Sequence, residues 1–525
     1  MKKLQKFITV LVAILLSCTT FVACGGGGGG GKGSLSITVY DAGFGYAWVE
    51  NMAVAFEEET GKSVTVKPVY DQESQIALLQ TGSHKSDILF MVQDSSMIAE
   101  DGNLADLTDL VYKKTPYGEE GKTIEELSPF SKALNIAGQG KYYAISYSAT
   151  VQSLLYNKDT LDAVFGEENY TLPNTTNEWI ALMDSILAYN TTKTANQQTA
   201  VPLISAANYM EYLTTTWWAQ YDGANTYMDY WRGYKDGAFC KEDPIFAKTE
   251  GRLEALKMLQ SVFTTSSPYV HPNTAEFFDD SQFKNAQRTF VGEYAADDKI
   301  VAFYPCGDWY ENEMGSLIEG HNVRMMKTPI LSSITNTFID SVDKQMTDEK
   351  LSSIIEKIDN NVAFTESEYG CKESTYNKVF EARNIVSTNG EQMQGFVPVT
   401  CSNKELAADF LRFMVSKKGQ SVYAQEMQGL HMGYGYNPFD DEEVEMSEFV
   451  KSVHDCFENS NSIYVYRDIS ELLSYRGGLA AFTTNNNLYT QAIFTGSHSA
   501  LAVYNDTYNT LKNQWSKYLA DSNLN

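Results

Sequence analysis

The residues that most often carry chemistry in proteins are scattered along this sequence and do not form short motifs. Neither the seven cysteines nor the six histidines include a CxxC or HExxH arrangement. The stretch Gly26 to Lys32 has most of the Walker A spacing, but Gly33 stands where a Ser or Thr would bind magnesium, and no strand pattern precedes it. The acidic run 440–443 lacks EF-hand spacing. We therefore expect no metal, no cofactor and no motif-based catalytic centre.

Cys24 is the cysteine with the most specific chemical context. A basic head, the apolar run 7–16 and then Val22-Ala23-Cys24 have the order of an export signal that ends at a small-residue cleavage site. The apolar run is shorter than the roughly 20 residues that span a bilayer. Val22-Ala23-Cys24 also resembles a bacterial lipobox, which implies cleavage before the cysteine and a diacylglyceryl group on its thiol.

Two cysteines compete for this modification. Cys18 is the alternative site, but the glycine run 25–31 follows Cys24 directly and predicts a flexible tether. We expect a lipoprotein signal peptide over 1–23, a Gly-rich tether over 24–34 and a protein anchored by its lipid to the outer face of the cytoplasmic membrane. An ordinary cleaved signal with an incidental cysteine is the other interpretation.

Length and charge restrict the classes of function. The 525 residues are enough for two or three domains with substantial cores. The formal net charge of −27 argues against nucleic acid, which is bound through Lys and Arg facing phosphates. It also disfavours adhesion to an anionic membrane surface and a polyanionic ligand. A neutral small molecule fits this charge better.

The first part of the chain after the tether alternates between strand and helix patterns. Period-two or continuous apolar runs predict strands at 35–39, 64–69 and 88–92, and helical spacing predicts a helix over 48–56. Strands that alternate with helices indicate parallel βαβ units. In open sheets of this kind, ligands bind beyond the carboxyl ends of the strands.

A series of short segments follows one another in a recognisable order. The segments are Ser36–Val39, Ala55–Gly61, Lys141–Tyr147, Leu155–Asp159, Asn174–Trp179, Val301–Trp309 and Ser402–Phe413. Together they resemble the extracellular solute-binding proteins of the carbohydrate, maltose-binding-protein-like family. The resemblance implies an α/β, type II periplasmic-binding-protein-like fold, in which hinge strands join two lobes and the ligand is clamped between them.

The resemblance also implies how the chain is divided. Lobe one is expected at 35–147 and 328–422, and lobe two at 148–327 and 423–525. The segment 331–395 exceeds the family pattern, and helical spacing predicts an extra surface helix at Leu351, Ile354, Ile355 and Ile358. A C-terminal helical stripe is expected to pack in the core; its members are Tyr504, Tyr508, Leu511, Trp515 and Tyr518.

Sugar chemistry indicates which side chains to look for. A sugar ring has flat C–H faces that stack on aromatic rings and a rim of hydroxyls that bind Asp, Asn, Gln or Arg. By the resemblance, Trp309 lies where the family places a stacking tryptophan, and Asp308 either accepts a hydroxyl hydrogen bond or caps the next helix. Trp217, Trp218 and Tyr221 form a second aromatic cluster. Adjacent residues on a helix point about 100° apart, so we expect one indole in the core and one in the cleft.

Further candidates come from loops at strand ends and from the expected crossings between lobes. They are Phe44 and Tyr46 in the first βα loop, Asp94 after the third strand, Tyr147 and Ser148 at the first crossing, and Tyr434 and Tyr436 in a glycine-rich loop. Each of these has core packing as its alternative role.

The sequence thus predicts a non-enzymatic, monomeric binding component of an ABC importer, which carries a sugar to a membrane permease. Other classes stay open. A secreted glycoside hydrolase needs two carboxylates that meet in space rather than in sequence. A binding protein for peptides or polyamines, or one that presents its ligand to a sensor, would share the fold. A polyamine site needs several acids in the cleft, whereas a sugar site needs exposed tryptophans.

Overall fold

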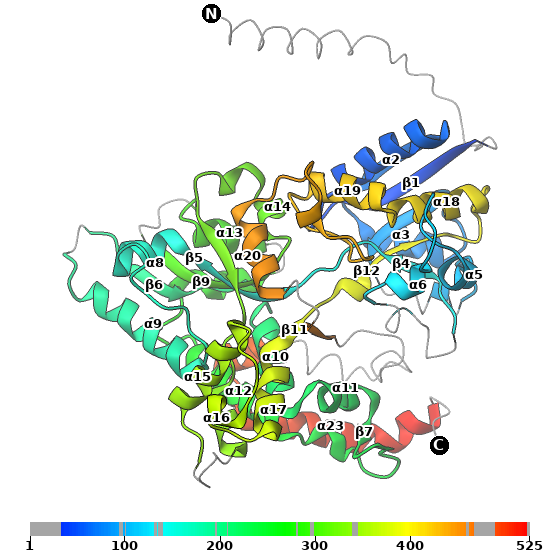
Figure 1. Cartoon of the computed structure of the whole chain (residues 1–525). Helices are drawn as coiled ribbons and strands as arrows, with labels where there is room; N and C mark the ends of the chain where they lie inside the picture. Colours follow the sequence, from blue (N-terminus) through cyan, green and yellow to red (C-terminus); the bar gives the residue numbers. More distant parts are fainter. Residues whose placement is uncertain are drawn as a thin grey trace, which may run out of the picture.

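The computed structural model describes residues 33–93, 98–99, 101–130, 134, 140–194, 197–206, 208–279, 282–294, 299–338, 345–457, 461–466 and 489–521 (Figure 1). The signal segment, Cys18, Cys24 and Asp94 lie outside these residues. Within them, no helix is long and apolar enough to cross a membrane. The cysteines in these ranges are all free thiols.

One sheet organises the first lobe. Its strands run in the order β2 (Ser63–Val69), β1 (Ser34–Tyr40), β3 (Ile88–Val92), β12 (Met393–Phe396) and β4 (Ala144–Ser146). β1 is parallel to β2 and β3, which confirms the predicted βαβ start, whereas β12 is antiparallel to its neighbours. The helices of this lobe are α2 (Ala47–Thr60), α3 (Gln72–Gln80), α5 (Thr108–Lys113), α6 (Ile124–Leu127), α18 (Lys404–Met414) and α19 (Lys417–Glu426).

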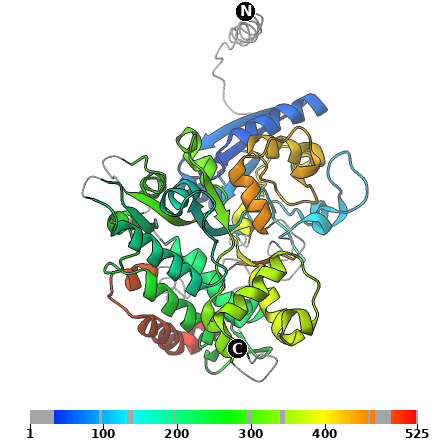
Figure 2. The ribbon, with the colours of Figure 1, turned by 60° about the vertical axis from the view of Figure 1, so that its left-hand side comes forward.

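A second sheet organises the other lobe. Its strands are β13 (Ile463–Val465), β11 (Ile385–Ser387), β5 (Gln152–Asn157), β9 (Ile300–Gly307) and β6 (Ala200–Leu203), and β10 (Val323–Met326) also pairs with β5. Around it lie α8 (Lys158–Phe165), α9 (Thr176–Asn190), α10 (Met210–Asp222), α11 (Ala224–Arg232), α12 (Glu250–Val262), α13 (Phe283–Phe290), α14 (Tyr310–Met314), α15 (Asp348–Asp359), α16 (Glu366–Tyr369), α17 (Glu373–Asn384), α20 (Glu448–Phe457), α22 (Tyr489–Phe494) and α23 (Ala500–Asp521). Figure 1 shows the first lobe around β1 and α2 at the upper right. Figure 2 shows that α23 lies at the end of the second lobe far from it.

Within the described part of the chain, three segments pass between the lobes. The chain leaves β4 for β5 through 147–151, returns from β11 to β12 through 388–392, and leaves α19 for α20, which packs on β10, through 427–447. These crossings run side by side and are joined by buried hydrogen bonds. The Ser146 hydroxyl donates to the Gly390 carbonyl at 2.9 Å, and the Tyr434 hydroxyl donates to the Ser146 carbonyl at 2.9 Å.

The return crossing differs from our expectation. We placed 328–422 in lobe one, but β11 pairs in the second sheet and α17 packs against α10 of the second lobe. The described residues of 328–387 therefore belong to the second lobe, and the return lies at 388–392. The reason is that the chain does not return to the first lobe directly after β10, because it first forms α15 and α17 in the second lobe.

Local sequence signals explain several elements. The Thr175 hydroxyl accepts from the Glu178 amide, and the Glu178 carboxylate accepts from the Thr175 amide, which is the capping box that starts α9. The extra helix predicted in 331–395 is α15, and it buries all four predicted residues, so it is a packed element rather than a surface one. On α23, Leu511, Trp515 and Tyr518 are buried, as expected for core packing.

Trp515 should be one of the residues on which the packing of α23 depends. Its ring is 1% exposed and packs against Phe246, and its indole N–H donates to the Cys240 carbonyl at 2.7 Å. We expect Trp515→Ala to lower the free energy of unfolding by about 3–5 kcal/mol in chemical denaturation. Leu501→Ala, on the same helix at a side chain that is 55% exposed, should change it by less than about 0.5 kcal/mol. Equal effects of the two substitutions would contradict this assignment.

Candidate ligand-binding site

A hollow of about 470 Å³ lies between the lobes. We call it the interlobe pocket. The first lobe contributes the loop that follows β1, together with one residue of α19, and the second lobe contributes residues of α13 and α14. The lining residues are Asp41, Ala42, Gly43, Phe44, Gly45, Tyr46, Ala47, Phe283, Lys284, Asn312, Glu313 and Glu426. Its position beyond the carboxyl end of β1 is the one expected for a ligand in an open α/β sheet.

Glycines shape the first-lobe side of this pocket. Gly43 and Gly45 have φ values of +60° and +65°, which side chains with a Cβ rarely adopt. These turns let the loop double back so that its backbone faces α14. The Asn312 side-chain amide, from the second lobe, donates a hydrogen bond to the Gly43 carbonyl. One contact thereby spans the pocket from lobe to lobe.

Glu313 is the carboxyl with the most altered environment in the pocket. Loss of hydration raises the pKa of Glu313 to about 7. Gln287, Lys284 and the Gly43 amide lower the pKa, but their combined effect is smaller than that of the lost hydration. The Gln287 side-chain amide donates to the Glu313 carboxylate at 2.5 Å. Near neutral pH the group therefore exists in both protonation states, so it can donate to a hydroxyl as well as accept from one.

The pocket combines three rings with polar groups. Phe44, Tyr46 and Phe283 supply the aromatic surface, whereas Asn312 and Glu313 supply amide and carboxyl oxygens. The described lining contains no tryptophan. Its formal charges are those of Asp41, Glu313, Glu426 and Lys284.

Two solved structures share this architecture. The apo form of RafE from Streptococcus pneumoniae aligns over 93% of this chain and 99% of its own, at 14% sequence identity and a TM-score of 0.55. The chain therefore shares the fold of RafE. The SBP RafE in complex with raffinose aligns over 91% of this chain and 99% of its own, at 13% identity and a TM-score of 0.53. No protein-family model and no curated protein sequence matches the chain.

Two of the residues predicted from the sequence line the interlobe pocket. They are Phe44, which is nearly buried, and Tyr46, which is half-buried. The sequence analysis missed Phe283, Asn312 and Glu313. Asn312 and Glu313 follow Trp309 within about one helical turn, so their proximity to the segment Val301–Trp309 was an available signal. Nothing local to Phe283 marks it.

Trp309 and Asp308 have structural roles at the end of β9. The Trp309 ring is 6% exposed and lies over Gly307, where an added Cβ would come within 2.1 Å of the ring. The Asp308 carboxylate accepts hydrogen bonds from the Thr150 hydroxyl and, at 3.2 Å, from the Val151 amide. Neither residue lines the interlobe pocket; Asp308 instead holds the first crossing against β9.

The aromatic cluster on α10 is packed in the second lobe. We expected one indole in the cleft, but Trp217 is fully buried and Trp218 is 6% exposed. The Trp217 indole donates to the Pro329 carbonyl at 3.1 Å, and Trp218 donates to Asp222 at 2.9 Å. Tyr221 is buried as well. The reason is that α10 packs against α11, α12, α17 and the second sheet, which cover both indoles.

The remaining candidates brace the crossings. Tyr147 stacks on Trp48 with ring centroids 5.2 Å apart, and Ser148 is buried next to it. Tyr434 is buried and bonds to the backbone of the first crossing, as described above. The Tyr436 hydroxyl donates to Asp441 at 2.6 Å. These four side chains therefore support the hinge region rather than line the interlobe pocket.

The raised pKa of Glu313 predicts a pH-dependent stability. Relative to its usual value of 4.5, the folded state binds this proton more tightly. The stabilisation is complete below about pH 4.5 and is lost as the pH rises through about 7. We expect the Tm of the wild type, relative to that of Glu313→Gln, to fall between about pH 5 and 8. The difference should correspond to about 1 kcal/mol, because solvent at the partly exposed carboxyl screens the effect.

Differential scanning calorimetry across this range measures the effect. Glu319→Gln, at an exposed carboxyl shortly after α14, controls for the substitution itself. Parallel pH profiles for the wild type and Glu313→Gln would contradict the prediction.

Proposed function

We propose that this protein is the lipid-anchored, extracellular binding component of an ABC importer. It takes up a neutral sugar or oligosaccharide in the interlobe pocket and delivers it to a membrane permease without altering it. The observation that carries the proposal is the pocket itself: both lobes contribute aromatic and polar side chains to one hollow of about 470 Å³. The fold shared with RafE, described in complex with raffinose, supports a sugar as the ligand class.

The charges of the pocket favour a neutral ligand. Asp41 and Glu426 are carboxylates, Lys284 is a cation, and Glu313 is only partly ionised near neutral pH. The formal balance therefore lies between one and two negative charges, which does not by itself require a cationic ligand. A hydroxyl-rich molecule uses every one of these groups as a donor or an acceptor.

Ligand capture would act through contacts from both lobes. Phe44 and Tyr46 come from the first lobe, and Asn312 comes from the second. A ligand that touches both sides favours the closed arrangement by no more than its differential affinity for that arrangement. The closed form is the one that would dock on the permease.

A polyamine is the second candidate ligand. Three carboxyl groups line the pocket, and the described lining lacks the tryptophan expected of a sugar site. The two ligand classes separate in one experiment. Isothermal titration calorimetry with raffinose, maltotriose and spermidine should give binding to a sugar and none to spermidine. Binding to spermidine alone would replace the sugar proposal with the polyamine one.

Tyr46 should contribute to sugar affinity by stacking. We expect Tyr46→Ala to weaken binding of the best sugar about tenfold, which corresponds to about 1.4 kcal/mol. Tyr234→Ala removes the same side chain on β7 (Tyr234–Lys235), outside the pocket, and should leave the affinity unchanged.

Chromatography of an oligosaccharide after incubation with the protein should show no hydrolysis. Turnover would move the protein to the hydrolases, where a carboxyl with a raised pKa serves as the general acid.

The lipid anchor has its own test. Expressed in a bacterial host fed labelled palmitate, the full chain should incorporate label, and Cys24→Ser should not. Cys18→Ser is the matched control and should be labelled like the wild type. Label that persists on Cys24→Ser but disappears on Cys18→Ser would move the anchor to Cys18.

A further inference from the structure

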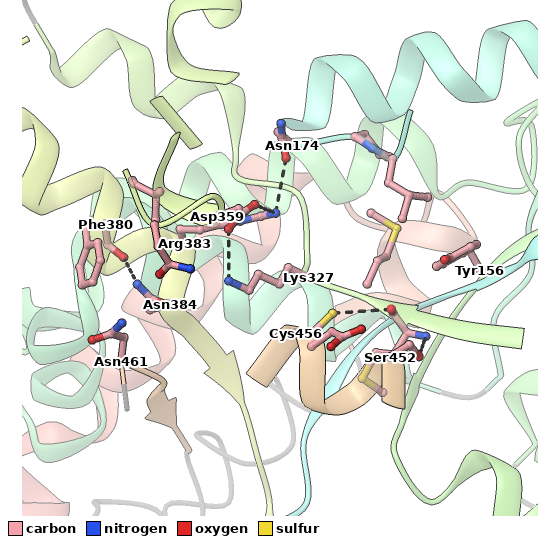
Figure 3. A pocket seen from close by; sticks show the side chains of 17 residues that line it. Tyr156, Asn174, Lys327, Asp359, Phe380, Arg383, Asn384, Ser452, Cys456 and Asn461 are labelled. Atoms are coloured by element: carbon pink, nitrogen blue, oxygen red, sulfur yellow. Dashed lines mark hydrogen bonds and ion pairs between the residues drawn. The ribbon is translucent and has the colours of Figure 1, made fainter. Parts of the chain in front are cut away.

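A second pocket lies inside the second lobe, away from the interlobe pocket. It opens beside β5, where β10 ends and β11 begins, and its volume is about 460 Å³. We call it the sheet-edge pocket. The walls come from α15, α17 and α20, and the residues that matter here are Tyr156, Lys327, Asp359, Phe380 and Arg383 (Figure 3).

Two cations share one carboxylate in this pocket. The Arg383 guanidinium binds Asp359 through Nε at 3.0 and 3.1 Å and through Nη2 at 2.6 Å, and Lys327 Nζ lies 3.3 Å from the same carboxylate. Burial favours the neutral acid, but the hydrogen bonds and charge of Arg383, helped by Lys327, hold the pKa of Asp359 below its usual value. The inner wall therefore carries a net positive charge. The other charged lining residue, Asp455, is exposed to solvent.

Arg383 has bonding capacity left over. Its side chain is 8% exposed, yet Nη1 has no hydrogen-bond partner among the described residues. Nη2 also donates to the Asn174 side chain at 3.4 Å, so the guanidinium is held in one orientation (Figure 3). Leaving a buried N–H without a partner has a free-energy cost. A ligand oxygen bound there would remove that cost, and guanidinium groups suit carboxylates and phosphates best.

The rest of the lining suits an organic molecule rather than a bare ion. Tyr156, Met326 and Phe380 offer apolar surface, and Asn384 and Asn461 offer amides. The volume lies within the range of about 300–1,000 Å³ that is usual for small-molecule pockets.

We propose that the sheet-edge pocket binds a small organic molecule that carries one anionic group, a carboxylate or a phosphate. The anionic group lies at the wall formed by Arg383 and Lys327, and the carbon skeleton lies against Tyr156 and Phe380. The segment that exceeds the family pattern builds much of this site, because α15 supplies Asp359 and α17 supplies Phe380 and Arg383. The site is independent of sugar binding between the lobes.

Calorimetry with three matched probes tests the proposal. Glucuronate presents a carboxylate, glucose 6-phosphate presents a phosphate, and glucose presents neither. We expect one of the two anions to bind with a Kd in the millimolar range or below and to bind more weakly in high salt. The anion that binds identifies the source of the negative charge. If neither anion binds more tightly than glucose, the proposal is wrong.

Variants locate the binding. Lys327→Met leaves the Arg383–Asp359 pair intact and should weaken anion binding at least tenfold. Lys451→Met, at an exposed lysine of α20 outside the pocket, should not. The double variant Asp359→Asn with Arg383→Gln replaces the ion pair by two amides and should abolish binding. Unchanged anion binding in a folded Lys327→Met or double variant would place the anion elsewhere and overturn the site.

A measurement on the unaltered protein removes the dependence on folding of the variants. Met325 and Met326 line the sheet-edge pocket, whereas Met52 is buried in the first lobe. With ¹³C-labelled methionine methyl groups, the anion should shift the resonances of Met325 and Met326 and leave that of Met52 in place. A shift confined to other methionines would contradict the site. Tyr46→Ala, which tests sugar binding between the lobes, should leave these shifts unchanged, so the two proposals can fail separately.

Discussion

The arrangement of the two lobes depends on buried hydrogen bonds where the chain passes between them. The Asp308 carboxylate accepts hydrogen bonds from Thr150 and Val151 in the first crossing. The Thr388 hydroxyl of the second crossing donates to the Thr150 carbonyl at 2.5 Å. The Tyr434 hydroxyl of the third crossing donates to the Ser146 carbonyl. Because these groups are buried, each would be costly if left unpaired. The bonds fix where the lobes meet, and through this they determine that the loop after β1 faces α14.

Sequence patterns predicted those elements that depend on residues only a few positions apart. The strands β1 to β3, the capping box at Thr175 and the buried faces of α15 and α23 follow from periodicity and capping chemistry within a few residues. The position of the return crossing did not follow. β11 is only three residues long, and its membership in the second sheet depends on pairing with β5 and β13, which are distant in the sequence.

In the candidate site too, features set by nearby residues could be predicted, whereas those set by residues distant in the sequence could not. Phe44 and Tyr46 could be predicted, because a loop after the first strand of a parallel sheet has a known position. Trp217 and Trp218 could not be placed, because their burial depends on how α10 packs against other helices and the sheet of the lobe. Asn312 meets Gly43 across 269 residues of sequence, and no spacing rule covers such a distance. The number of aromatic residues therefore does not identify the site. The backbone topology determines which rings line the interlobe pocket.

The altered acidity of Glu313 has a calorimetric consequence. A carboxyl with a pKa of about 7 is close to half-protonated at the pH of most binding experiments. A ligand that fills the cleft and changes the hydration of this group will take up or release a fraction of a proton. The buffer supplies or accepts that proton, so the measured heat of association should depend on the ionisation enthalpy of the buffer, even for an uncharged ligand.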